Sequence, residues 1–298
     1  MIGLIGLLGC LSAVPRAEES WEIAAINQDL NLLDLRMSRG DTELLRGQGR
    51  ARLDLASRQD IPLSFARDGL PAEVQAPPEG GLVVGPDSLL RGEDGWTLRL
   101  QEEGLLARLR LLTDGAAADP VVQSSNRGSW SVEAPVLRGE LQGMLQAGTR
   151  GEMYAARAVL IHRKGEDPPG LRGTAQHAVY VMDKDLSVGI DQTGSLALSW
   201  ILVGDAMWLH EPGMLRPHKG GGWEMDFRPS ADLYVRVIPR KRPSLRTPML
   251  DRLSTPERWL VRALVGEPTR RIQGCRAELT IAGVRHTAPA MLVAVEYR

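Results

Sequence analysis

Strict alternation of apolar and polar side chains constrains the fold of this chain more than any other sequence feature. Trp96, Leu98 and Leu100 fall on one face of an extended segment, and the residues between them are polar. The same period of two recurs at 50–55, 105–111, 196–202, 223–228 and 291–297. This period is typical of strands with one face on a core and one face in water. Turn sequences such as Glu93-Asp94-Gly95 separate the segments, so we predict an all-β chain of antiparallel barrels or sandwiches.

One amphipathic helix is predicted in the second half of the chain. Ser254-Thr255-Pro256-Glu257 has the spacing of a capping box, with proline just inside the helix. An apolar stripe follows at Trp259, Leu260, Ala263 and Leu264. Gly266 is typical of a helix end, and Pro268 prevents the helix from resuming.

The best candidate for a domain boundary is the polar, proline-containing segment 165–170. It divides the 298 residues into two portions, and each has an ordinary domain size. We therefore predict a leader and tether over 1–19, a first barrel domain over 20–167 and a second over 168–298. The helix belongs to the second domain.

Composition excludes several functional classes. The net charge of −1 provides no overall field to attract nucleic acid. Aromatic residues make up 4% of the chain, which leaves few platforms on which bases could stack. Two cysteines cannot form a four-thiolate metal site, and the five histidines do not follow a metal-binding motif. We expect no nucleic-acid partner, no metal and no cofactor.

The N-terminal segment has two interpretations. The apolar run 2–8 is too short to span a bilayer and matches the central region of a secretory signal. Leu7-Leu8-Gly9-Cys10 looks like a bacterial lipobox, in which Cys10 is lipidated and anchors the chain to a membrane. This interpretation predicts a periplasmic or cell-envelope protein. The alternative is that the run is a first strand.

The pattern resembles a known family. An opening Trp21-Glu22-Ile23 begins the series, and the later segments 44–50, 85–89, 95–98, 136–141 and 158–162 follow in order. Together they resemble the tandem lipocalin-like carotenoid hydratases, or hydroxyneurosporene synthases. The resemblance implies two lipocalin-like barrels and a pocket for an isoprenoid or another apolar molecule. Some relatives hydrate an alkene, some cyclise their substrate, and related fungal proteins steer a cycloaddition.

The resemblance also implies where chemistry would occur. The family's Asp-His-containing motif matches here at His162, but Ile161 replaces the Asp and no Trp follows. Protonating an alkene requires an acid in a dry cavity and benefits from an aromatic face beside the developing cation. The candidate catalytic residues are His162, Glu166 and Asp183, with Asp185 and Asp191 also considered, and the candidate ligand-binding residues are Tyr180, Trp200 and Trp96.

Each of these residues also has an ordinary structural interpretation. The aspartates favour turns, a histidine at a strand end is commonly just hydrogen-bonded, and Trp200 lies in an apolar stripe typical of a core. The leading functional hypothesis is binding of a small apolar molecule in a barrel pocket. The alternatives are a cofactor-independent hydratase or cyclase acting on an isoprenoid, and an envelope structural or interaction protein with filled barrels.

Overall fold

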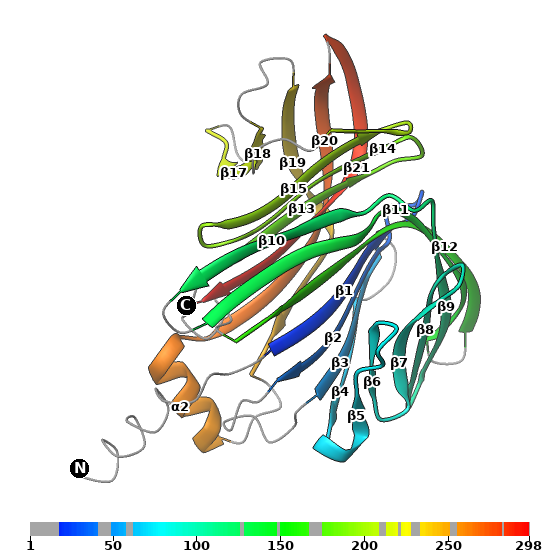
Figure 1. Ribbon diagram of the computed structural model, residues 1–298, viewed down its shortest axis with the longest axis vertical. Coiled ribbons are helices and arrows are strands. Elements are labelled where there is room, and N and C mark those ends of the chain that lie inside the picture. Colours follow the sequence, from blue (N-terminus) through cyan, green and yellow to red (C-terminus); the bar gives the residue numbers. More distant parts are fainter. Residues whose placement is uncertain are drawn as a thin grey trace.

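The computed structural model describes residues 18–40, 49–57, 62–125, 128–147, 150–166, 175–208, 213–219, 222–227, 233–250, 255–281 and 283–297. Within these residues the chain forms a 12-stranded antiparallel sheet followed by a 9-stranded one. The first sheet curls into a nearly closed barrel and the second into a half-barrel (Figure 1). The predicted all-β class with two lipocalin-like barrels is therefore confirmed.

The first sheet contains β1 (Glu18–Ile26), β2 (Leu32–Gly40), β3 (Gly49–Ala56), β4 (Leu63–Gly69), β5 (Val74–Gln75), β6 (Gly81–Val84), β7 (Asp87–Gly92), β8 (Gly95–Glu102), β9 (Leu105–Thr113), β10 (Ala118–Ser125), β11 (Gly128–Ala147) and β12 (Arg150–Gly165). A short 3-10 turn over Pro71–Glu73 precedes β5. The strand order is β4-β3-β2-β1-β12-β11-β9-β8-β7-β6-β5, and β10 pairs with β11.

The second sheet contains β13 (Gln176–Met182), β14 (Leu186–Thr193), β15 (Leu196–Val203), β16 (Ala206–Trp208), β17 (Met214–Pro217), β18 (Trp223–Asp226), β19 (Leu233–Pro248), β20 (Pro268–Ile281) and β21 (Val284–Tyr297). Its order is β16-β15-β14-β13-β21-β20-β19-β18-β17. The chain changes sheet between β12 and β13. Most of the expected boundary segment lies outside the described residues, as do positions 1–17, which include Cys10 and most of the expected leader. The remaining leader positions, 18 and 19, form the start of β1.

The predicted helix is α2 (Thr255–Val265), which lies beside the lower ends of the long strands in Figure 1. It ends as expected, since Gly266 has a left-handed φ of 87° and its N–H donates to the Arg262 carbonyl at 3.1 Å. Ser254, the expected N-cap, lies outside the described residues.

The alternating side chains form three apolar layers. One fills the first barrel and includes Ile23, Leu35 and Leu98. A second lies between the two sheets and includes Ile26, Val159 and Met291. A third fills the concave side of the second sheet and includes Val188 and Leu279. Because successive residues of a strand face opposite sides, β1 supplies the first layer with Ile23 and the second with Ala24.

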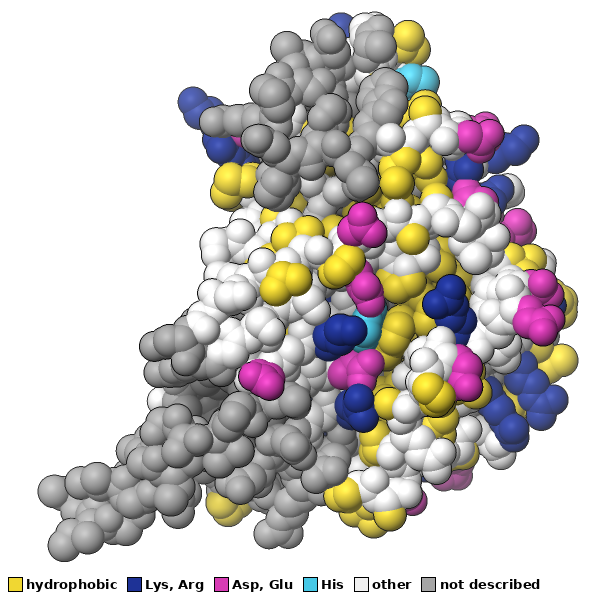
Figure 2. Space-filling model, in the orientation of Figure 1, with side chains coloured by type: hydrophobic (Ala, Val, Ile, Leu, Met, Phe, Trp, Pro, Cys, Tyr) yellow, Lys and Arg dark blue, Asp and Glu magenta, His cyan; other side chains and the backbone are white. Residues whose placement is uncertain are grey.

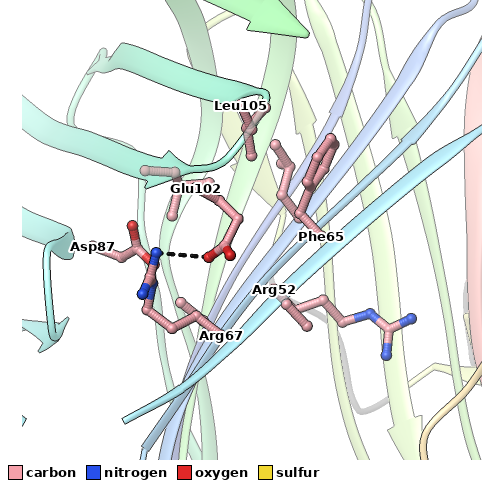
Figure 3. A pocket seen from close by; sticks show the side chains of 10 residues that line it. Arg52, Phe65, Arg67, Asp87, Glu102 and Leu105 are labelled. Atoms are coloured by element: carbon pink, nitrogen blue, oxygen red, sulfur yellow. Dashed lines mark hydrogen bonds and ion pairs between the residues drawn. The ribbon is translucent and has the colours of Figure 1, made fainter. Parts of the chain in front are cut away.

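The first barrel has a seam where β4 faces β6 to β8 without a backbone ladder. Arg67 on β4 closes the seam: its guanidinium contacts Glu102 at 2.6 Å and Asp87 at 3.1 Å (Figure 3). Behind this clamp, Phe65 and Leu105 help to line a cavity of about 10 Å³. That volume holds roughly one water molecule, so side chains fill the barrel at this seam.

Candidate functional site

The strand register extends the interior face of the first barrel to His162. On β12, Ala156, Ala158 and Leu160 face the barrel interior, and His162 continues that row to the end of the strand. His162 lies directly opposite Trp21 on β1 and Glu133 on β11. Glu19, two residues before Trp21, lies on the same face of β1. We call Glu19, Trp21, Glu133 and His162 the His162 cluster.

Two carboxylates bind the imidazole of His162. Its Nδ1 lies 2.5 Å from Oε1 of Glu133, and its Nε2 lies 2.9 Å from Oε1 of Glu19. Both ring nitrogens are therefore engaged by carboxylates from two different strands, β11 and β1. The side chain of His162 is 5% exposed, whereas that of Glu133 is 29% exposed. The cluster therefore reaches solvent on the Glu133 side.

Glu19 is held in its ionised form. Burial raises the pKa of its carboxyl, but the hydrogen bond from His162 and the charge of Arg39 outweigh burial and lower that pKa to about 2. The Nε of Arg39 donates to Oε2 of Glu19 at 2.6 Å. The carboxylate is thus fixed between an imidazole and a guanidinium.

Aromatic rings cover the other side of the imidazole. The Trp21 ring stacks on His162 with a centroid separation of 3.7 Å and an angle of 11°. Trp96 lies next, with its ring centroid 4.8 Å from that of Trp21. The structure thus brings two predicted site residues, His162 and Trp96, close together through Trp21. Chemically, the cluster offers a shared proton beside aromatic faces that could stabilise a cation.

Glu166 and Asp183 lie apart from this cluster. Glu166 is exposed beyond the end of β12, where its N–H donates to the Ser129 carbonyl at 2.9 Å. Asp183 lies in the turn between β13 and β14 of the second sheet. The predicted catalytic set is therefore divided among three places, and its assignment stays a prediction.

A cavity of about 290 Å³ opens at one mouth of the second sheet. Its wall is apolar and comprises Leu186, Val203, Ile281 and Ala288, while its rim comprises Asp183, Lys184, Asp185, His286 and Thr287. The register explains this arrangement, because Val179 and Val181 face the apolar layer of this sheet and Asp183 continues their row into the turn. Two of the aspartates considered from sequence thus lie at a cavity mouth.

Tyr180 and Trp200 lie between the two sheets. The Tyr180 hydroxyl donates to Oδ2 of Asp191 at 2.9 Å, and burial together with that charge raises the pKa of Tyr180 well above its ordinary value. Trp200 stacks on Tyr180 at a centroid distance of 5.9 Å. Its ring occupies the space beside Gly189, where an added Cβ would lie 2.1 Å from a ring carbon. Tyr180 and Trp200 join the two sheets, and their assignment to a ligand stays a prediction.

Figure 2 shows basic and acidic side chains interleaved over the described part of one face, with an apolar strip between them.

Within the described residues, no group of three or more His, Cys, Asp or Glu side chains is placed to hold a metal ion. The helix in this part of the chain falls short of the length and apolar character needed to cross a membrane.

Comparisons with known proteins find similarity in structure. No family model matches the sequence, and no curated protein matches it. CghA, solved with Sch210972, has a TM-score of 0.65 at 12% identity, covering 95% of this chain and 89% of CghA. An AttH-type protein of Nitrosomonas europaea has a TM-score of 0.60 at 9% identity, covering 95% and 93% of the two chains.

Kievitone hydratase from Nectria haematococca has a TM-score of 0.55 at 10% identity, covering 96% of this chain and 90% of the hydratase. At these identities the likeness concerns the fold alone. Over nearly its whole length, therefore, this chain has the two-sheet lipocalin-like fold that it shares with CghA, the AttH-type protein and kievitone hydratase.

Proposed function

We propose that the chain binds a small molecule with an apolar body at the mouth of the second sheet. The observation that carries this proposal is the 290 Å³ cavity, with its apolar wall and charged rim. Small-molecule sites are typically concave and mostly apolar, with a few polar groups that orient the ligand, and they begin at about 300 Å³. The resemblance to carotenoid hydratases supports an isoprenoid or lipid-like ligand, of which this cavity would hold a short segment.

The size of the cavity sets the expected affinity. A six-carbon chain buried in it gains roughly 0.8 kcal/mol per methylene, or about 4–5 kcal/mol in total. That corresponds to a dissociation constant of about 1 mM or somewhat lower. A soluble probe such as 1-hexanol therefore suits a test at millimolar concentration.

Calorimetric titration of 1-hexanol tests the proposal. Ala288 is 3% exposed and forms part of the cavity wall, so Ala288→Phe should occupy part of the cavity and weaken binding. Ala66→Phe places the same side chain at the seam of the first barrel and should leave binding unchanged. If Ala66→Phe alone abolishes binding, the ligand enters the first barrel and the proposal is wrong. Absence of binding by the unaltered protein would favour a structural or interaction role.

A second candidate function, acid catalysis on an alkene, is favoured by one observation. His162 is held between two carboxylates and against the ring of Trp21, which itself packs on Trp96, and this arrangement suits proton donation beside a developing cation. A structural neighbour is named a hydratase. Because the first barrel is filled at its seam, a substrate would approach from the exposed Glu133 side. Incubation with isoprenoid alkenes in heavy water should then introduce deuterium into the product, and its absence would exclude this candidate.

We also propose a cell-envelope location, which rests on the lipobox-like sequence that ends at Cys10. In the native host the protein should lack the residues before Cys10 and carry lipid on that cysteine. Mass spectrometry of the purified protein measures both. A cytosolic protein that retains Met1 would overturn this location.

A further inference from the structure

A polar group lies within the otherwise apolar layer between the two sheets. Glu22 on β1 is 0% exposed, and its Oε2 contacts Arg163 of β12 and Arg270 of β20, each at 3.0 Å. Arg270 also contacts Asp34 of β2 at 2.6 and 2.9 Å. Arg163 further pairs with Asp191 of β14. These contacts connect the two sheets through ion pairs that are shielded from solvent.

Four polar atoms of this group have no hydrogen-bond partner among the described residues. They are Ser20 Oγ, Glu22 Oε1, Arg163 Nε and Arg270 Nη1. Their side chains adjoin one another: Ser20 lies opposite Arg163 in the β1–β12 pair, and Glu22 contacts both arginines. Each of the four residues is at most 2% exposed. Two unmatched donors therefore adjoin an unmatched acceptor and a hydroxyl.

Their chemistry restricts what can bind them. Leaving one buried polar atom unpaired costs about 1–3 kcal/mol, so four of them together are a substantial penalty. Both guanidiniums are already paired with carboxylates, and the unmatched atoms include an oxygen of the Glu22 carboxylate, which would repel an additional anion. A cation would be repelled by the two free N–H donors. A neutral molecule that both donates and accepts hydrogen bonds satisfies all four atoms.

We propose that this group forms a buried hydration site, in which at least one ordered water bridges Arg163, Arg270, Glu22 and Ser20. Internal waters typically make about three hydrogen bonds to otherwise unpaired buried groups. The water would complete the polar connection between the two sheets. This site is separate from the proposed ligand cavity, so a negative result for ligand binding would leave the hydration site unaffected.

A crystal structure of the full chain tests whether water or an anion occupies this site. The crystals are grown in a solution that contains bromide and no chloride. We expect density for water within hydrogen-bond distance of at least three of the four atoms, and no anomalous bromide signal there. A bromide signal would overturn the assignment to water. So would a structure in which the four atoms find protein partners or no density lies among them.

A stability measurement provides a second test. If water is bound, Ser20→Ala removes one of its partners and should lower the thermal unfolding midpoint. If the site is dry, the same change deletes an unpaired buried hydroxyl and should leave the midpoint unchanged or raise it. Ser187→Ala is the matched control, since this 1% exposed serine contacts protein partners, Leu137 and Trp200. The thermal unfolding midpoint of Ser187→Ala should fall. A midpoint that falls in Ser187→Ala but is unchanged or raised in Ser20→Ala would contradict the proposal.

Discussion

Replacing Arg270 with methionine should destabilise the protein strongly. Arg270 is 1% exposed and makes contacts at 2.6 and 2.9 Å with Asp34 and at 3.0 Å with Glu22. Methionine keeps much of the side-chain volume but leaves two carboxylates, at most 1% exposed, without this guanidinium. Breaking a buried pair by removing one partner costs about 3–5 kcal/mol, mainly because the remaining charge stays desolvated. We expect Arg270→Met to fall in that range.

Urea denaturation with linear extrapolation measures this cost. Arg110→Ala is the control, because its 2.9 Å pair with Asp94 has side chains that are 53% and 77% exposed. An exposed pair contributes about 0–1 kcal/mol. The double variant Arg270→Met with Asp34→Leu should recover part of the loss, since it removes one of the two carboxylates and Glu22 keeps its contact with Arg163. If Arg270→Met costs no more than Arg110→Ala, the charges between the sheets are not desolvated and this reasoning is wrong.

Three further predictions follow from the same structure. Because the pKa of Glu19 is lowered from 4.5 to about 2, its ionised form contributes stability above pH 4.5 that is lost as the pH falls towards 2. Solvent screens this half-buried group, so we expect about 1–2 kcal/mol in all. The acid titration of Glu19→Gln should lack this loss of stability, and an acid profile like that of the unaltered protein would contradict it. Gly189→Ala should lower the free energy of unfolding in urea by about 1–3 kcal/mol, because the new methyl group would lie 2.1 Å from a ring carbon of Trp200. In the control Gly151→Ala the nearest atom lies at 3.7 Å, so the free energy of unfolding should change by less than about 0.5 kcal/mol. Equal losses in the two variants would show that the Trp200 ring moves aside. If the chain catalyses acid chemistry, His162→Ala should lower turnover about 100-fold with little change in substrate binding. If instead the unaltered protein is inactive and Ile161→Asp is active, the fold has been retained and the catalytic activity has been lost.

The strands could be predicted from the sequence because the pleat itself imposes the period of two. Trp96, Leu98 and Leu100 do face the interior of the first barrel, as their alternation indicates. The pairing of strands that are distant in sequence could not be predicted in the same way. β1 lies between β2 and β12, and no local pattern specifies a partner more than 100 residues away.

The candidate site was accessible from the sequence only in part. His162 could be singled out through the family resemblance, but its carboxylate partners could not. Glu133 and Glu19 lie 29 and 143 residues from it, and only the strand register brings them to its two nitrogens. Glu19 also falls in the segment 1–19 that we predict as leader and tether, so the pattern does not point to it.

Tyr180 and Trp200 illustrate a different limit. Both side chains lie on an apolar face, but β13 and β15 each have two apolar faces, one towards the concave side of the second sheet and one towards the first sheet. The pattern cannot distinguish these faces. Asp183 and Asp185, chosen from a turn, lie at the cavity because the turn ends a row of inward-facing side chains.

Methyl NMR during a 1-hexanol titration tests the central claim most directly. Leu186, Val203 and Ile281 report on the cavity of the second sheet, while Leu53 and Leu105 report on the seam of the first barrel in the same spectrum. We predict that the methyl chemical shifts of Leu186, Val203 and Ile281 change in a saturable way at millimolar hexanol. The methyl shifts of Leu53 and Leu105 should stay unchanged. Shifts confined to Leu53 and Leu105, or none at any of the five, would contradict it.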